Sequence, residues 1–398
     1  MHNGKRFLYL SLFWAINFCL GSFYAWSIYS TWLSDVLSVT TQTFVSPSSL
    51  AYIFSIGAAL NPIAMILGGF VSDRYSPKIV LYFGGFLASL GYFLMSISED
   101  ASLILLGYGI CLGMGSGACV IATVSTAVKL FPDKRGFASG SVSAFYGVGS
   151  ICLPPLANYL ASTIGISRAL QLFACICFIV IVLSASVIQI KSKAQTQHSI
   201  QQSDFTWLEM IKTKRFWAMF ILFVSVTLSP LMLFSQTVTI AQIQVELPIT
   251  LAVLSVSILA CANTLARFVA GVLSDSIGRA NTLLIAVTLA IVGLVLLSLA
   301  SVESQGLFFL GLICIGACFG SSVGVFPSYA AEQFGVSHAS MNYGVLALAF
   351  SVAGLLGPNI IHLTVNNGQY EVAYYIAIAI SLLGVIAAIC CKRIERRV

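Results

Sequence analysis

Long apolar runs dominate this sequence and leave it few ways to fold. Stretches of about 20 residues or more recur along the 398-residue chain, with 59% of all residues hydrophobic and only 8% charged. A soluble domain is about 25% charged, so no soluble fold could hide this much apolar surface. The runs do not alternate between apolar and polar residues as strands would, so we expect an integral membrane protein whose spans are helices.

Turn residues and charge clusters divide the apolar runs into twelve predicted transmembrane helices, making this an all-α membrane protein. The first run follows MHNGKRF without a small-residue cleavage site, so we interpret it as a span and not as a removed signal peptide. The predicted spans are residues 7–30, 49–71, 78–97, 101–130, 136–163, 167–190, 215–240, 249–273, 280–300, 305–331, 339–363 and 370–391.

The distribution of basic residues predicts the orientation of these spans. An even number of spans puts both termini on one side, and all but two of the nineteen Lys and Arg fall on that side. The exceptions are Arg168, on the opposite side, and Arg267, within a predicted span. The positive-inside rule therefore predicts cytoplasmic termini in a plasma membrane, or a bacterial inner membrane. The net charge of +6 follows from this topology and requires no nucleic-acid partner.

A polar stretch at residues 191–214 separates six predicted helices from six, and the two halves repeat. We predict bundles at 1–190 and 215–398, joined by this linker, with a short interfacial helix around residues 205–211. A shift of 202 residues aligns SIGAALNPIAMILGGFVSD, ending at Asp73, with SILACANTLARFVAGVLSD, ending at Asp275. Parallel repeats of this kind are typical of carriers in which two bundles rock about a substrate site near the bilayer midplane.

Two loop segments and four helical stretches carry a family resemblance. GFVSDRYSPK at 69–78 and GVLSDSIGRA at 271–280 resemble the loop signature of the major facilitator superfamily, although Ser276 stands in the second copy where the first has Arg74. GSFYAWSIYS, KLFPDKRGFASGSVSAFYGVGS, NTLARFVAGVLSD and NYGVLALAFSVAGLLGP together resemble the oxalate–formate antiporter family, which includes monocarboxylate carriers. The resemblance covers nearly the whole chain. It implies two six-helix bundles, with a gate formed by Asp73, Arg74, Asp275 and Arg279.

Arg267 lies inside a predicted span, where an arginine costs about 2.5–3.5 kcal/mol or more. Its side chain could snorkel to the predicted helix end about 9 Å away, against the usual tilt of helical side chains. It could instead pair with an acid, although all thirteen acids fall in loops, in tails or at helix ends, with Glu332 the best placed. The hypothesis we favour is that the anion is the substrate, held beside Asn263 one turn away.

The resemblance also implies that a helix-8 arginine binds the substrate carboxylate. Dicarboxylate carriers of the family are expected to have a second cation on helix 11, where this chain has the uncharged VLALAFSVAG with Phe350 near the expected place. We therefore predict a monocarboxylate, exchanged for another anion or carried with protons. Tyr24 and Tyr146 are further candidate site residues, although Tyr24 could equally be an interfacial aromatic.

Other functional classes find less support in the sequence. We expect no metal or other cofactor, because the eleven cysteines lack paired CxxC spacing. An enzyme is not expected either, since no histidine is placed for catalysis. The remaining alternatives are an exporter of drugs or other amphipathic metabolites, which usually has a membrane acid, and a transporter-like nutrient sensor, which usually has a soluble output domain. We expect the chain to act as a monomer.

Overall fold

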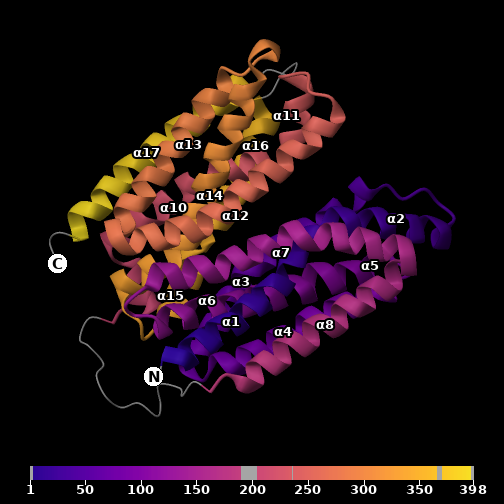
Figure 1. The fold of residues 1–398 in the computed structure, drawn as a ribbon, viewed down its shortest axis with the longest axis horizontal. Coiled ribbons are helices and arrows are strands. Elements are labelled where there is room, and N and C mark those ends of the chain that lie inside the picture. Colours follow the sequence, from indigo (N-terminus) through magenta and orange to yellow (C-terminus); the bar gives the residue numbers. More distant parts are fainter. Residues whose placement is uncertain (1–2, 190–203, 235, 365–369, 396–398) are drawn as a thin grey trace. The chain divides into compact units, whose positions relative to one another are not determined.

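The computed structural model describes residues 3–189, 204–234, 236–364 and 370–395, and every regular element within these ranges is helical (Figure 1). Twelve helical segments are long and apolar enough to cross a membrane. The first-half elements are α1 (Asn3–Leu20), η1 (Gly21–Ala25), α2 (Trp26–Thr41), η2 (Pro47–Leu50), α3 (Ala51–Arg74), α4 (Pro77–Ser96), α5 (Ala101–Ile104), η3 (Leu105–Leu112), α6 (Gly113–Leu130), α7 (Arg135–Ile164) and α8 (Ile166–Val187).

The second half of the sequence is equally helical, and the twelve spans confirm the fold class expected from the apolar runs. Its elements are α9 (Trp207–Ile211), α10 (Lys214–Phe234), α11 (Thr237–Ile243), α12 (Ile249–Ile277), α13 (Arg279–Ser298), η5 (Val302–Ser304), α14 (Gln305–Phe334), α15 (Ala339–Leu346), α16 (Leu348–Thr364) and α17 (Glu371–Glu395).

Several boundaries differ from those predicted, and those of the first, seventh and eighth spans have a clear local description. The first helical segment runs on through the η1 turn to Thr41, although residues 7–30 were expected. The seventh, expected at 215–240, ends at Phe234 and is followed by a separate short helix, α11. The eighth runs to Ile277, beyond the expected 273, and ends at Gly278, whose positive φ of 89° favours glycine and takes the backbone out of the helix. Arg267 therefore lies deeper in its helix than the sequence suggested.

The described chain forms two compact units, each with its own helix packing. The first contains Met1–Phe131, Phe145–Asp204 and Phe334–Val345, and in it α4 packs on α8 and α3 packs on α6. The second contains Pro132–Ala144, Phe205–Gln333 and Leu346–Val398. In the second unit, α10, α13 and α17 pack side by side (Figure 1).

The predicted division at the central linker stays a prediction. Residues 190–203, most of the linker, lie outside the described residues. At its end, α9 covers most of the predicted interfacial helix at 205–211. This short helix begins with a capping box, in which the Thr206 hydroxyl accepts from the backbone of Glu209 and the Glu209 carboxylate accepts from the backbone of Thr206.

Glycines bring equivalent helix pairs of the two halves into backbone contact. A methyl group added to Gly117 on α6 would lie under 3.0 Å from the carbonyl oxygen of Asn61 on α3. Gly320 on α14 has the same relation to Asn263 on α12. Small residues allow such close approach between membrane helices. The same contact therefore sets the α12–α14 spacing beside Arg267.

Candidate functional site

Arg267 is buried on α12, with only 5% of its surface exposed. Its Nε donates a hydrogen bond to Asn263 Oδ1 at 3.1 Å, and its Nη1 donates to the backbone carbonyl of Ser143 at 3.0 Å. Asn263 lies on the same helix face because it is four residues away. Both acceptors are uncharged, so these two bonds orient the guanidinium without neutralising it.

Two glycines bring neighbouring helices against the backbone of Arg267 within the second unit. A methyl group on Gly140 of α7 or on Gly324 of α14 would come within 2.5 Å of the Arg267 carbonyl oxygen. Neither helix could approach so closely with a larger residue at that position. The guanidinium is therefore attached to a backbone that is closely packed on two sides.

The structure bears on both alternative explanations of Arg267. The Arg267 guanidinium is buried and donates to Asn263 and to the Ser143 carbonyl, so the side chain does not extend to an exposed surface. Glu332, the best placed acid in the sequence, instead pairs with Arg279 at 2.7 Å. Snorkelling and a pair with Glu332 therefore both fit the geometry poorly.

The aromatic candidates belong to two different units. In the first unit, the rings of Tyr24 and Tyr146 meet edge to face with centroids 5.8 Å apart, and the Tyr146 hydroxyl lies 3.4 Å from that of Ser116. Tyr24 is 42% exposed. In the second unit, the Phe350 ring packs against Phe319 at 5.9 Å. Tyr24 and Tyr146 thus form one aromatic pair, and Phe350 belongs to another.

The first loop signature places Asp73 at the start of another helix. Its carboxylate accepts hydrogen bonds from the backbone N–H of Met341 at 2.9 Å and of Ser340 at 3.4 Å, in the first turn of α15. Lys129 contributes an ion pair, with Nζ 2.5 Å from Oδ1. The acid therefore satisfies orphan donors of α15 and faces the positive end of its dipole.

Arg74, the other predicted gate residue of this copy, is exposed. Its guanidinium carbon lies 5.7 Å from the ring centroids of both Phe70 and Tyr75. Such a separation is typical of a cation–π contact, which contributes about 0.5–1 kcal/mol at an exposed site. In this copy the cation of the described ion pair is Lys129, which the sequence analysis did not single out.

The second loop signature repeats the arrangement with a different set of charges. Asp275 accepts from the backbone N–H of Gly136 and Phe137, both at 2.8 Å, where α7 begins. Its partner Arg279 lies 2.7 Å away and also pairs with Glu332. The hydroxyl of Ser274 accepts a further hydrogen bond from Arg279. One cation thus joins two carboxylates, whereas among the described residues Asp73 of the first copy pairs with Lys129.

Sequence reasoning missed several residues of these clusters. Ser143 gave no signal, because it acts through a backbone carbonyl. Lys129 and Glu332 did leave a signal in the sequence, because a shift of 203 residues places them at equivalent positions with opposite charge. Comparing charges across the repeat would have pointed to Lys129 as the partner of Asp73 and to Glu332 as a second partner of Arg279.

Comparison with known proteins agrees with this architecture. The chain is 28% identical over 386 residues to the oxalate:formate antiporter of Oxalobacter formigenes, covering 96% of this chain and 90% of that protein. It is 29% identical over 357 residues to the uncharacterized transporter YhjX of Escherichia coli K12, covering 89% and 87%.

Solved structures support the same fold. The human organic anion transporter MFSD10 matches with a TM-score of 0.72 at 14% identity, covering 98% of this chain and all of that one. The fucose:proton symporter of E. coli matches with a TM-score of 0.62 at 16% identity, covering 94% and 98%. The model of the Major Facilitator Superfamily matches residues 12–358, and the chain therefore belongs to that superfamily of membrane transporters.

Proposed function

We propose that this transporter carries small organic anions, in particular monocarboxylates, and that Arg267 binds the carboxylate. The observation that supports this most is a buried guanidinium on a membrane-spanning helix, oriented by the neutral oxygens of Asn263 and Ser143. Charged side chains within membrane segments are costly and usually mark a substrate pathway. The resemblance to an oxalate:formate antiporter supports a carboxylate as the substrate.

The chemistry of arginine suits this role. A guanidinium has five N–H donors in one plane, so it can bind protein acceptors and a carboxylate together. The hydrogen bonds to Asn263 and Ser143 fix the plane of the guanidinium and therefore the direction of its remaining N–H donors. The span at 339–364, which includes Phe350, has no Lys or Arg. Arg267 is then the cation proposed for the substrate, and a single cation neutralises a monocarboxylate better than it neutralises a dicarboxylate. Tyr24, Tyr146 and Phe350 complete the proposed set of substrate contacts.

The two signature clusters are proposed to form the gate of the transport cycle. Asp73 and Asp275 each hold the first turn of another helix, α15 or α7, so breaking these bonds would release that helix. Arg279 strengthens the second cluster, and Arg74 is assigned to the first. We propose that the clusters form in one state of the cycle and open in another.

Counterflow in proteoliposomes tests the substrate. Vesicles containing the purified protein are loaded with unlabelled formate, lactate, pyruvate or oxalate and given the labelled form outside. We expect accumulation of one or more monocarboxylates, with oxalate weaker. Uptake by Arg267→Gln should fall at least about 30-fold, because removing one partner of a buried charge pair costs about 2 kcal/mol or more.

Two controls make the result specific. Arg168→Gln removes an exposed cation at the opposite predicted surface and should leave uptake unchanged. Arg267→Lys keeps the charge but loses the fork, so uptake should be partly retained. Wild-type uptake by Arg267→Gln, or transport of amines and not anions, would refute the proposal. Imposing a pH gradient separates proton symport, which it drives, from exchange, which it does not.

A further inference from the structure

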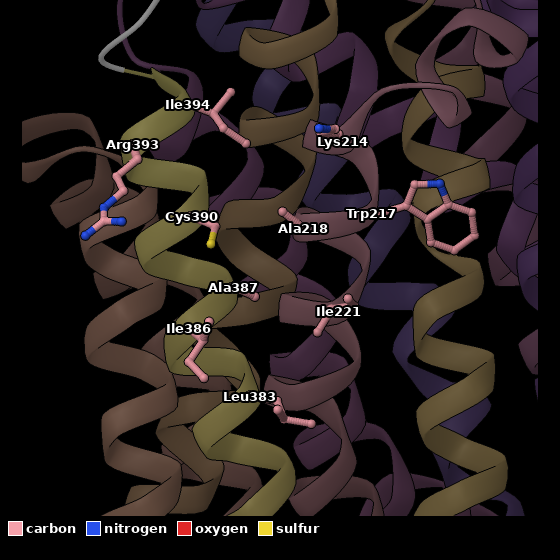
Figure 2. A pocket seen from close by; sticks show the side chains of 10 residues that line it. All are labelled: Lys214, Trp217, Ala218, Ile221, Leu383, Ile386, Ala387, Cys390, Arg393 and Ile394. Atoms are coloured by element: carbon pink, nitrogen blue, oxygen red, sulfur yellow. The ribbon is translucent and has the colours of Figure 1, made fainter.

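A groove of about 540 Å³ lies between α10 and α17 in the second unit. The helices are antiparallel here, so the start of α10 lies beside the end of α17. Figure 2 shows Lys214 and Arg393 near one end of the groove and Leu383 at the other. Ile221 and Ile386 line its apolar part. The groove is therefore lined almost wholly by apolar surface, and its two cations lie at the end nearest one membrane surface.

The large apolar side chains that line the groove face outward, not into a packed core. Trp217 is 55% exposed, Leu383 56% and Ile386 59%, although all three lie in membrane-spanning segments. Large apolar side chains exposed on a span lie against lipid, because the bilayer is their solvent. A groove among them therefore offers an apolar surface along which a lipid chain can pack.

The two cations at the end of the groove are available for an anion. Lys214 and Arg393 are both exposed, and neither forms an ion pair with any described residue. Lys214 begins α10 and Arg393 lies in the last turn of α17, which places both charges at headgroup depth. Basic pockets between transmembrane helices at this depth favour anionic headgroups.

We propose that this groove binds an anionic phospholipid of the leaflet on the side where α10 begins and α17 ends. The phosphate is bound by Lys214 and by Arg393, whose guanidinium points away from the groove in Figure 2 and turns toward it when the lipid binds, and an acyl chain runs along Ile221, Ile386 and Leu383. A zwitterionic lipid offers the same chains, but its headgroup carries an additional cation that the two basic residues repel. The site is separate from Arg267 and independent of the substrate.

Photolabelling in nanodiscs tests this site. Full-length protein is reconstituted with trace phosphatidylglycerol or phosphatidylcholine carrying a diazirine in one acyl chain, and labelled peptides are mapped by mass spectrometry. We expect phosphatidylglycerol to label peptides 214–221 and 383–394 more than phosphatidylcholine does. Lys214→Gln/Arg393→Gln should weaken this labelling about 30-fold, because each surface cation contributes roughly a five-fold effect.

The control removes two other exposed cations through Lys5→Gln/Lys134→Gln and should keep the preference. A third variant, Cys390→Trp, keeps both charges but fills the groove, so labelling by both probes should fall there while other lipid-facing peptides stay labelled. Equal labelling of the wild type by the two probes overturns the proposal. A phosphatidylglycerol preference that survives in Lys214→Gln/Arg393→Gln also overturns it.

Discussion

Arg267 is oriented by one acceptor on its own helix, Asn263, and by one on α7, the Ser143 carbonyl. Arg267 was found because a charge stood within an apolar run, and Asn263 because helical spacing places it on the same face. The Ser143 carbonyl that accepts from Nη1 was not predictable, since it depends on the packing of α7 against α12. Side-chain chemistry on one helix can be read locally, whereas a backbone contact between helices cannot.

At the residue scale, Asn263→Ala is expected to weaken substrate binding while leaving the carrier folded. The change removes the acceptor of Arg267 Nε, and a hydrogen bond to a charged group contributes about 1.5–3 kcal/mol. We therefore expect KM for the carried monocarboxylate to rise at least about ten-fold in proteoliposome uptake. The matched control is Asn61→Ala, the equivalent position, whose amide donates to the Gly113 carbonyl at 3.3 Å. An equal effect of the two changes would argue for a purely structural role.

At the scale of elements, apolar length predicted the spans well, and the errors have local causes. The run at 249–273 was ended too early because Ser274, Asp275 and Ser276 look like a loop, yet they continue α12 until Gly278. Polar residues at a membrane surface do not prevent a helix from continuing, so composition alone predicted the wrong C-terminal end for this span. A backbone that leaves the helical region does end it.

The contact between α12 and α14 predicts a position-specific cost. Gly320→Ala should lower the stability of the carrier by about 1–3 kcal/mol, because the added methyl group meets the Asn263 carbonyl and backbone must shift. Thermal unfolding in detergent, followed by size-exclusion chromatography, would show a lower midpoint. Gly306→Ala on the same helix is the control, since no atom lies within 4 Å of the added group. Equal midpoints for the two variants would contradict this packing.

The junction of α12 with the start of α7 gives a second prediction at this scale. Asp275→Asn should shift the conformational equilibrium away from the state described here, because it removes the charge facing Arg279 and the α7 N-terminus. We expect faster cysteine labelling of Ser274→Cys/Asp275→Asn than of Ser274→Cys alone, since Ser274 is buried in this state. Glu99→Gln, an exposed acid elsewhere, should have no such effect. Unchanged labelling would exclude Asp275 from the gate.

At the scale of the whole molecule, the repeat and the distribution of charge predict topology together. Superfamily membership and twelve spans make this a multi-pass membrane protein. The orientation follows only from the positive-inside rule, which counts basic residues near the spans. It stays a prediction because the described geometry of the helices would be the same in either orientation.

Reporter fusions would determine this orientation. We expect green fluorescent protein to fluoresce when fused after Val398, and alkaline phosphatase to be active when inserted after Gly165, beside Arg168. Alkaline phosphatase inserted after Pro132 should be inactive, because that loop carries basic residues and is expected in the cytoplasm. Activity at Pro132 with none at Gly165 would reverse the predicted orientation.

The opposite charges of Lys129 and Glu332 have a consequence for the history of the chain. In a protein descended from a duplicated half, Glu332 without Arg279 would face Asp275 as a second carboxylate. Arg279 beside a lysine would instead gather two cations around one acid. A change at position 279 or at position 332 alone would therefore bring like charges together, and among related genes we expect an acid at position 332 to be inherited together with a cation at position 279.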